Sequence, residues 1–380
     1  MNAVILVGGE GTRMRPLTET VPKPLLPLMD RRSLDHVLDH LARHGVHEVV
    51  LSSPYLEQEF HPFIEARRGE PSITWITETH ALGTGGAIVN ALAAAGADPF
   101  FALNGDILTD LDLTAMRAFH GDRGAAVTIA LHHEDDARAF GLVETGDDGR
   151  VLEFREKPED PVPGDINAGT YLLDPAVLGD YTPGEPASIE RDIFPAVIAA
   201  GHPVYGYVAE AYWLDLGTPE KYLQAHFDMF EGKVHDVTYP APWVAGGAEV
   251  DLRAHLGRWV AVGAGAAIGA DAQVDDSVLH QGARVGAGAR VSGSVLAAGA
   301  VVGDGAIVEG CVLGTVAPAR ARPFPARPTI RSRALPRRRR PASRRAPASA
   351  SSARASDTAS ACRSGARTAW PRWDGRTSAS

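Results

Sequence analysis

The sequence contains little cysteine and no long hydrophobic segment near its N-terminus. Its 380 residues include two cysteines, Cys311 and Cys362, whose spacing fits neither a metal site nor a disulfide framework. The apolar run near the N-terminus, Val4 to Val7, is too short for a signal peptide or a membrane span. We therefore expect two unpaired cysteines and a cytoplasmic protein without a membrane partner.

Lysine is missing from the C-terminal part, since every lysine lies at or before Lys233. From Val316 onward the chain has 16 arginines and 2 aspartates, a net charge of +14, while the residues before it carry −24. Residues 315–380 have few aliphatic side chains and no period, so they cannot bury enough apolar surface to fold. Such a basic tail could bind nucleic acid. Its Arg/Ala/Pro/Ser mixture instead favours a GC-rich gene translated in a shifted frame. We predict a disordered tail without a nucleic-acid partner.

Residues 1–232 alternate between short apolar runs and amphipathic helical patterns. This alternation is typical of a Rossmann-like α/β domain with a mixed, mostly parallel sheet flanked by helices. Apolar residues recur with helical spacing from Leu34 to Leu41, which predicts a helix with Ser33 as its N-cap and Gly45 as its stop. Strands are expected at residues 3–7, 48–52, 73–76, 100–103 and 126–131. Ligands of such a sheet bind at the carboxyl ends of its strands.

The rest of the ordered chain has a different period. Residues 233–259 are rich in proline, glycine and alanine without periodicity, and we interpret them as a linker. From residue 260 to residue 314 one aliphatic residue recurs about every six positions among small residues. A disordered segment would not keep its aliphatic residues in phase, whereas the narrow core of a parallel β-helix requires this interval. We predict a left-handed hexapeptide-repeat β-helix, truncated at about residue 314.

The loop after the first strand reads "GGEGTRMRPLT" at residues 8–18 and is followed by "PKP" at 22–24. It is not a P-loop, because no lysine follows a glycine, and it is not a Rossmann fingerprint, because Met14 takes the third glycine place. What remains is a glycine turn whose backbone N–H groups can approach an anion. Arg13, Arg15 and Lys23 add fixed positive charge. The stretch therefore predicts phosphate binding.

These motifs resemble those of the sugar-1-phosphate nucleotidylyltransferases, also called nucleotide-sugar pyrophosphorylases. The family loop Gly-Gly-x-Gly-Thr-Arg-x-Arg-Pro-Leu-Thr and its Pro-Lys-Pro match residues 8–18 and 22–24 throughout. The resemblance continues in order through "LGTGGA" (82–87), "NGD" (104–106), "FREKP" (154–158), "NAG" (167–169) and "YWLDLGTPEKY" (212–222). It then runs into the hexads, so it covers residues 1 to about 314. The family reaction is attack of a sugar 1-phosphate oxygen on the α-phosphorus of a nucleoside triphosphate, which displaces diphosphate.

The resemblance implies the catalytic residues Arg13, Lys23, Asp106 and Asp215. Arg13 and Lys23 are expected to hold the departing diphosphate, and the two aspartates to bind Mg²⁺. The residues agree with this chemistry, since bringing two polyanions together requires fixed positive charge and a divalent cation. Both aspartates follow apolar strands, and hard carboxylates suit Mg²⁺. A single aspartate after a strand is more often a helix cap, as we predict for Asp112.

The resemblance also implies the substrate contacts. A sugar-phosphate site would comprise Lys157 on the phosphate, with Gly141, Glu156 and Asn167 on the sugar. Without the resemblance, Glu156 and Lys157 would be interpreted as a solvated charged turn. The nucleotide site would comprise Gly8, Gly9, Gly11, Thr12, Arg13, Glu78, Gly83 and Thr84.

Glu78 carries the prediction of the base. The thymidylyl and uridylyl members of the family have glutamine at this place, five residues before Gly83. A carboxylate only accepts hydrogen bonds, so it suits the adjacent N1–H and N2–H₂ donors of guanine and disfavours uracil and thymine. The overall pattern is most similar to the bacterial mannose-1-phosphate guanylyltransferases. We therefore expect GTP and α-D-mannose 1-phosphate as substrates. A glucose-1-phosphate thymidylyl- or uridylyltransferase is the alternative.

Two further hypotheses belong to other functional classes. A non-catalytic regulatory relative that binds nucleotide sugars would have lost some of the four catalytic residues, and all four are present. An acyltransferase acting through the β-helix would require a catalytic histidine, and His280 is the one histidine of residues 260–314, at a place where an aliphatic residue is due.

Adjacent His132 and His133 could suggest a metal site, but neighbours on a strand point to opposite faces, so we interpret them as surface residues. The β-helix could also mediate homo-oligomerisation.

Overall fold

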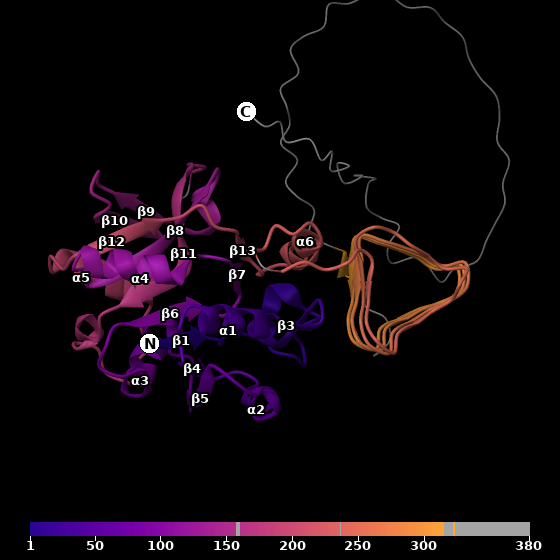
Figure 1. The fold of residues 1–380 in the computed structure, drawn as a ribbon, viewed down its shortest axis with the longest axis horizontal. Helices are drawn as coiled ribbons and strands as arrows, with labels where there is room; N and C mark the ends of the chain where they lie inside the picture. Colours follow the sequence, from indigo (N-terminus) through magenta and orange to yellow (C-terminus); the bar gives the residue numbers. More distant parts are fainter. Residues whose placement is uncertain (157–159, 236, 315–321, 324–380) are drawn as a thin grey trace, which may run out of the picture.

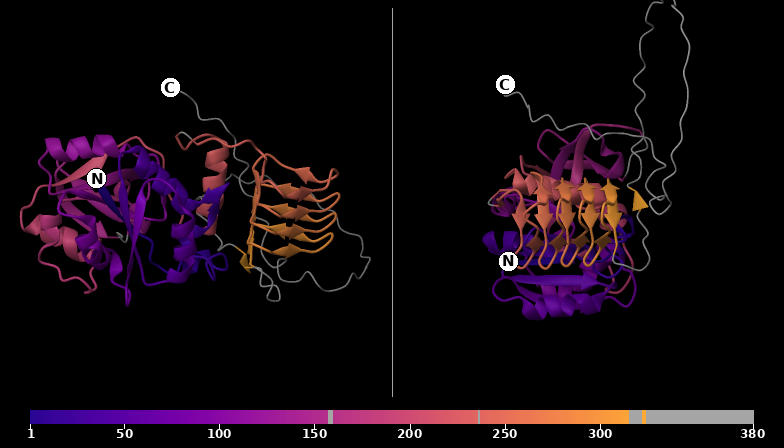
Figure 2. Two further views of the ribbon diagram at one scale, coloured as in Figure 1. Left: turned by 60° about the horizontal axis from the view of Figure 1, so that its bottom comes forward. Right: turned by 90° about the vertical axis from the view of Figure 1, so that its right-hand side faces the viewer.

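The computed structural model describes residues 1–156, 160–235, 237–314 and 322–323. Two units stand side by side, a sheet flanked by helices and a triangular β-helix, and helix α6 (Pro219–Phe230) lies between them (Figure 1). The second view shows the stacked coils of the β-helix edge-on (Figure 2). No helix among these residues is long and apolar enough to cross a bilayer.

The first unit is built on one mixed sheet, which confirms the predicted architecture. Its parallel part has the order β5-β4-β1-β6, and the antiparallel strand β11 joins β6 to β8 and to the hairpin β9–β10, while β12 pairs parallel with β8. The five strands expected from the sequence are all present. The strands are β1 (Asn2–Leu6), β4 (Glu48–Ser53), β5 (Ser72–Thr77), β6 (Phe100–Asn104), β8 (Val127–Glu134), β9 (Gly141–Thr145), β10 (Val151–Glu156), β11 (Gly164–Leu173) and β12 (Val204–Val208).

Helices cover both faces of this sheet because the central strands are apolar on both sides. In β1, Val4 packs into the core with α3 and α5, whereas Ile5 packs into the opposite core with α1, α2 and α4. The helices are α1 (Ser33–Arg43), α2 (Glu57–Ala66), α3 (Gly83–Ala95), α4 (Leu113–Asp122) and α5 (Phe194–Ala199), and the short helical turns are η1 (Thr12–Met14), η2 (Lys23–Leu25), η3 (Ala137–Ala139), η4 (Pro175–Leu178) and η5 (Ile189–Ile193).

The ends of α1 and α4 test three predicted caps. Asp112 caps α4 as expected, since its Oδ1 accepts from the backbone N–H of Ala115 at 2.9 Å. Gly45 ends α1 in the left-handed region, with φ of 74°. The predicted N-cap is wrong by one residue, because Ser33 is the first helical residue and Arg32 precedes it. The Ser33 hydroxyl instead donates to the carbonyl of Pro24 at 2.8 Å, which ties α1 to η2.

The second unit is the predicted β-helix, in which each coil contributes one strand to each of three parallel sheets (Figure 1). Four complete coils are formed by β14 (Trp243–Val244), β15 (Glu249–Val250) and β16 (His255–Leu256), by β17 (Val260–Val262), β18 (Ala267–Ile268) and β19 (Gln273–Asp275), by β20 (Ser277–Leu279), β21 (Arg284–Val285) and β22 (Arg290–Ser292), and by β23 (Val295–Leu296), β24 (Val301–Val302) and β25 (Ile307–Glu309). Strand β26 (Cys311–Leu313) begins a fifth coil and pairs with β27 (Arg322–Pro323). The predicted tail lies otherwise outside the described residues.

The predicted linker at 233–259 requires a correction, because residues 243–256 already form the first coil. Val244, Val250 and Leu256 are six residues apart and in phase with Val262, so the period begins earlier than we predicted. Glutamate, leucine, arginine and histidine between them obscure the pattern of small residues that marks the later coils.

The two units share an apolar core. The sheet β14-β17-β20-β23-β26 packs against α6 and against three segments of the first unit, namely η1, the two-stranded ribbon β2 (Pro27–Leu28) with β3 (Arg31–Arg32), and the pair β7 (Ile107–Thr109) with β13 (Trp213–Asp215). Two buried histidines, His226 of α6 and His280 after β20, lie at this junction. The junction therefore joins the β-helix firmly to the first unit.

These histidines predict that acid destabilises the fold. Burial lowers the pKa of His226 to about 4 and that of His280 to about 3, whereas an unfolded histidine has a pKa near 6.5. The unfolded chain therefore binds more protons, and stability that is present at pH 7 is lost as the pH falls below 6.5. We expect the free energy of unfolding to fall by about 2 kcal/mol per histidine between pH 7 and pH 5. Urea unfolding at both pH values measures this change.

Matched variants assign the loss to the junction. His280→Gln removes one buried titrating group, so its urea midpoint should change less between pH 7 and pH 5 than that of the unchanged chain. His255→Gln replaces an exposed histidine of β16 and should keep the full change. An equal change in all three proteins would contradict the prediction.

Candidate functional site

The glycine loop follows β1 at the carboxyl edge of the sheet. Gly9 and Gly11 have φ of 109° and 55°, and a Cβ on Gly11 would lie 3.0 Å from Thr18. The Thr18 hydroxyl donates to the Gly11 carbonyl at 2.7 Å, and Met14, which is fully buried, anchors the end of the loop. Four of the predicted loop residues are exposed, namely Gly8, Gly9, Thr12 and Arg13.

Lys23 lies on η2 between Pro22 and Pro24, and its side chain is only 11 % exposed. Its Nζ donates to Asp106 Oδ2 at 2.5 Å and lies 3.8 Å from Asp215 Oδ1. A nearly buried ammonium between two carboxylates is a fixed positive group that points to the carboxyl ends of β1 and β6. The structure thus joins three of the four predicted catalytic residues.

The two aspartates are brought together by the antiparallel pair β7 and β13, in which Asp215 pairs with Ile107. The backbone N–H of Leu216 also donates to the Asp106 carbonyl at 2.9 Å. The Asp106 and Asp215 side chains are 35 % and 19 % exposed. Because both carboxylates approach the same Lys23 ammonium and stay partly exposed, they offer hard oxygen ligands to a cation. No group of three His, Cys, Asp or Glu that could hold a metal occurs in the described part of the chain.

Gly217 is a site residue that the sequence reasoning missed. A Cβ at this position would lie 2.8 Å from Asp215 Oδ1 and 3.0 Å from a terminal nitrogen of Arg13. The guanidinium of Arg13 therefore approaches the same point as Asp215, which completes the predicted group of four. The glycine two residues after Asp215 in "LDLGTP" was the available signal.

The predicted base loop lies at the end of β5 and the start of α3, at the same edge of the sheet as the glycine loop. Glu78 is buried, accepts from the Ser52 hydroxyl at 2.8 Å and lies 3.3 Å from the backbone N–H of Leu82. The Thr84 hydroxyl donates to Glu190 at 2.7 Å. Gly83 has φ of 70°, and a Cβ there would lie 2.7 Å from the Ala187 carbonyl. All three residues therefore have contacts inside the protein that fix the loop.

The predicted sugar residues lie on the strands beyond β6. Gly141 begins β9 and pairs with Glu156 at the end of β10. The side chain of Glu156 and the whole of Lys157 lie outside the described residues. Asn167 on β11 donates to the Tyr171 hydroxyl at 2.7 Å and accepts from the N–H of Gly169 at 2.9 Å. The structure therefore places three of these four positions on neighbouring strands.

An aromatic group beside Asp215 was also missed. Trp213 lies two residues before Asp215 on β13, donates its indole N–H to the Ala168 carbonyl at 2.9 Å, and stacks on His132 with ring centroids 4.9 Å apart. The Lys221 ammonium lies 4.9 Å from the centre of the Phe140 ring, next to Gly141. His132 is thus half-buried rather than on the surface, whereas His133 is exposed as predicted.

Comparison with known proteins finds relatives over most of the chain. Residues 2–231 match the family described as nucleotidyl transferase. The mannose-1-phosphate guanylyltransferase of Mycobacterium tuberculosis is 39 % identical over 294 residues, which cover 73 % of this chain and 79 % of that protein. A probable mannose-1-phosphate guanylyltransferase 2 of Arabidopsis thaliana is 36 % identical over 291 residues, with coverage of 73 % and 79 %. The structure of HddC from Yersinia pseudotuberculosis complexed with GMP-PN is 30 % identical, with a TM-score of 0.52 over 59 % of this chain and 97 % of that one.

Proposed function

The chain belongs to the nucleotidyl transferase family, and we propose that it converts GTP and α-D-mannose 1-phosphate into GDP-mannose and diphosphate. The observation that carries the proposal is the meeting of Arg13, Lys23, Asp106 and Asp215 at one sheet edge. The names of the relatives support guanylyl transfer to mannose 1-phosphate, and the GMP-PN complex of HddC supports a guanine nucleotide.

The fixed charges account for the chemistry. In-line displacement at a phosphorus requires positioning and charge stabilisation rather than covalent help. Lys23 and Arg13 would stabilise the negative charge that builds up on the departing β- and γ-phosphates. Lys23 is well placed for this role because two prolines and two carboxylates hold it before substrate arrives. Little reorganisation is then needed during the reaction.

Asp106 and Asp215 fit a divalent cation, which we propose to be Mg²⁺. Their partly exposed oxygens already attract one cation, the Lys23 ammonium, and carboxylates with water and phosphate oxygens are the usual ligands of this ion. The chemistry that the bound ion supplies is neutralisation of the triphosphate oxygens. Asp106 and Asp215 would hold it where the α-phosphate meets the sugar phosphate.

The sugar phosphate would lie on the β9–β11 side of this group. We propose that Lys157 binds its phosphate, that Glu156 accepts from sugar hydroxyls, and that Asn167 makes a further sugar contact. Gly141 would allow the sugar to approach the backbone of β9. The pairing of Gly141 with Glu156 and the position of Asn167 on the adjacent strand support this arrangement.

A substrate screen tests the proposal. The full chain is incubated with Mg²⁺, mannose 1-phosphate or glucose 1-phosphate, and GTP, dTTP, UTP or ATP in turn, and diphosphate release is measured. We expect GTP with mannose 1-phosphate to give the highest kcat/KM. Faster reaction with dTTP or UTP would favour the thymidylyl- or uridylyltransferase alternative. Absence of diphosphate with every pair would indicate a non-catalytic relative.

Glu78 is expected to contribute to the choice of guanine. Its oxygens retain lone pairs beyond the contacts with Ser52 and Leu82. Glu78→Gln keeps the shape but introduces a donor opposite the donors of guanine, which costs about 1–3 kcal/mol. We therefore expect kcat/KM for GTP to fall roughly ten- to hundredfold, while the melting temperature changes little. An unchanged ratio of GTP to UTP activity would show that the backbone of the loop selects the base instead.

A further inference from the structure

The β-helix faces the first unit with one specific row of side chains. Ala261, Val278, Val295 and Val312 pair in register across β17, β20, β23 and β26. All four are at most 3 % exposed and belong to the shared core rather than to the interior of the β-helix. We call these four residues the docking row.

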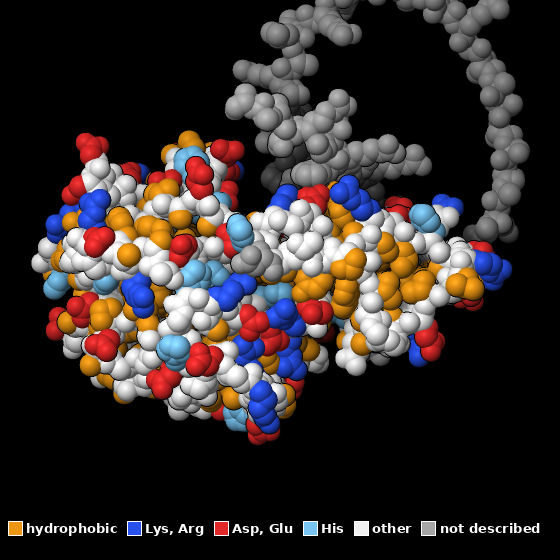
Figure 3. Space-filling view, in the orientation of Figure 1, with side chains coloured by type: hydrophobic (Ala, Val, Ile, Leu, Met, Phe, Trp, Pro, Cys, Tyr) orange, Lys and Arg blue, Asp and Glu red, His pale blue; other side chains and the backbone are white. Residues whose placement is uncertain are grey.

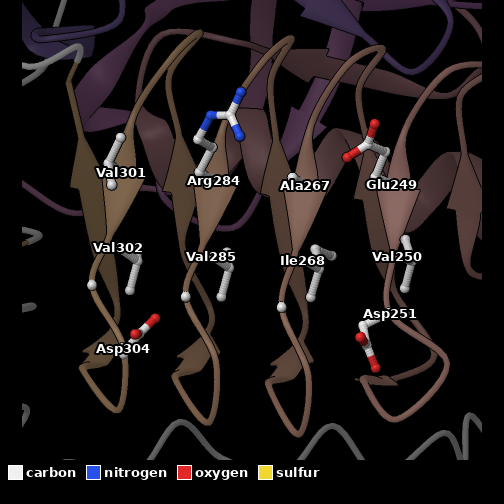
Figure 4. Close-up of a pocket in the computed structure, with 13 residues that line it drawn as sticks. Glu249, Val250, Asp251, Ala267, Ile268, Arg284, Val285, Val301, Val302 and Asp304 are labelled. Carbon is white, nitrogen blue, oxygen red and sulfur yellow. The ribbon is translucent and has the colours of Figure 1, made fainter.

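The neighbouring sheet β15-β18-β21-β24 provides a row of equivalent side chains for comparison. There the corresponding positions are Glu249, Ala267, Arg284 and Val301, and they stand on the outer surface of β15, β18, β21 and β24 (Figure 4). Val301 is 53 % exposed, although it lies in the same coil as Val295. Other apolar side chains of the β-helix also remain on its surface, as the space-filling view shows (Figure 3). The full burial of the docking row is therefore specific to the face that contacts the first unit.

Besides residues of α6, the apolar cluster that contains the docking row includes chain neighbours of the four catalytic residues. Met14 follows Arg13, Leu26 lies three residues after Lys23, and Leu108 lies two residues after Asp106, while Leu216 follows Asp215. These segments come from distant parts of the sequence and meet in one apolar cluster with the docking row. A Cβ on Gly314, directly after β26, would also lie 3.0 Å from Pro16. The β-helix thus packs behind the catalytic group.

A buried polar chain links the β-helix to the Lys23 segment. The Tyr222 hydroxyl donates to the Pro27 carbonyl, and His280 Nε2 lies 2.9 Å from the same hydroxyl. Burial raises the pKa of Tyr222, so its hydroxyl keeps the proton and His280 acts as the donor to its oxygen. His36 Nε2 lies 3.0 Å from the next carbonyl, that of Leu28. The segment after Lys23 is therefore held from two sides.

We propose that the β-helix positions the catalytic residues, and that His280 is a positioning residue that acts on Lys23 through Tyr222 and Pro27. This inference rests on the proposed function. The expectation of an aliphatic residue at position 280 was wrong, because Leu279 fills the aliphatic position of this coil in register with Val262 and Leu296. The proposal gives His280 the role of a hydrogen-bond donor rather than a catalytic one. An interface that only adds stability would need apolar contact, but not a buried donor aimed at the segment that carries Lys23.

Four variants test the proposal. His280→Leu removes the donor, and His280→Gln retains one. Val295→Asp places a charge in the docking row, and Val301→Asp places it on the exposed row of the same coil. The measurements are kcat and KM for the triphosphate, and hydrogen–deuterium exchange of residues 12–29 without substrates.

We expect His280→Leu to lower kcat about tenfold, the equivalent of one lost hydrogen bond, with little change in KM and faster exchange in residues 12–29. His280→Gln should recover most of kcat. Val295→Asp should lose more activity than His280→Leu, and Val301→Asp should behave as the unchanged chain. The proposal is overturned if His280→Leu keeps full kcat and unchanged exchange, or if His280→Gln loses as much as His280→Leu. Hydrogen–deuterium exchange needs no turnover. It therefore tests whether His280 positions residues 12–29 even if the unchanged chain shows no activity in the substrate screen.

Discussion

Asp106→Asn and Asp215→Asn are each expected to lower kcat by roughly 10²–10³-fold, the range found when one charge-stabilising group is removed from an active site. Each substitution removes one of the two proposed carboxylate ligands and leaves a neutral amide of the same shape. Because β7 and β13 hold both positions through backbone pairing, the fold should survive the change. Steady-state diphosphate release at saturating GTP and mannose 1-phosphate measures the effect.

The same variants should require more metal. With one carboxylate left, the Mg²⁺ concentration for half-maximal rate should rise, and part of the lost rate should return at high Mg²⁺. Asp122→Asn is the matched control, since Asp122 is exposed at the end of α4, and it should keep the full rate. A loss of less than about threefold in either site variant would be too small for a metal ligand.

Lys23→Met is expected to change rate and metal affinity in opposite directions. Methionine keeps most of the side-chain length but removes the charge that would stabilise the departing diphosphate, so kcat should fall by roughly 10²–10³-fold. In the free protein, however, the Lys23 ammonium competes with a metal for Asp106 and Asp215, which lie 2.5 and 3.8 Å from it. Removing the competitor should therefore tighten metal binding in the absence of nucleotide.

Titration calorimetry with Mn²⁺, in parallel with the rate assay, measures both effects. Arg253→Met is the control for loss of a positive charge, because Arg253 is exposed on the β-helix, and it should change neither quantity. Weaker Mn²⁺ binding by Lys23→Met would show that the lysine supports the site and does not compete for it. An unchanged kcat would show that Lys23 does not take part in the reaction.

Much of the fold follows from local patterns. The strands of the first sheet and α1 are encoded by apolar periodicity, and the β-helix by its six-residue period. These signals depend on neighbours within one turn or one coil, so they are visible in the sequence. The early start of the β-helix was missed because Val244, Val250 and Leu256 are separated by bulky and charged residues.

The docking face also has a partial sequence signal. Strands of the docked sheet carry two adjacent apolar residues, as in Val278-Leu279 and Val295-Leu296, because one points inward and the other to the first unit. Strands of the other sheets place an exposed residue first, as in Arg284-Val285. This pattern marks the covered side in the coil β20–β22 but not in the next coil, where the exposed Val301 and Ile307 make β24 and β25 doubly apolar as well.

The site could be predicted only in part. Each proposed catalytic residue stands in a recognisable motif. The pairing of β7 with β13, which brings Asp106 to Asp215, joins positions more than 100 residues apart and leaves no local pattern. The contact of Lys23 with both aspartates and the approach of Arg13 to Gly217 are equally long-range. The internal partners of Glu78 and Thr84 depend on Ser52 and Glu190, which no motif singles out.

The position of an isotope label tests the central claim most directly. Mannose 1-phosphate carrying ¹⁸O in its phosphate is allowed to react with GTP and Mg²⁺ on the full chain, and both products are analysed by mass spectrometry. If a sugar-phosphate oxygen attacks the α-phosphorus of GTP, all ¹⁸O appears in GDP-mannose and none in diphosphate. Label in diphosphate, or GDP-mannose formed without diphosphate, would contradict the account.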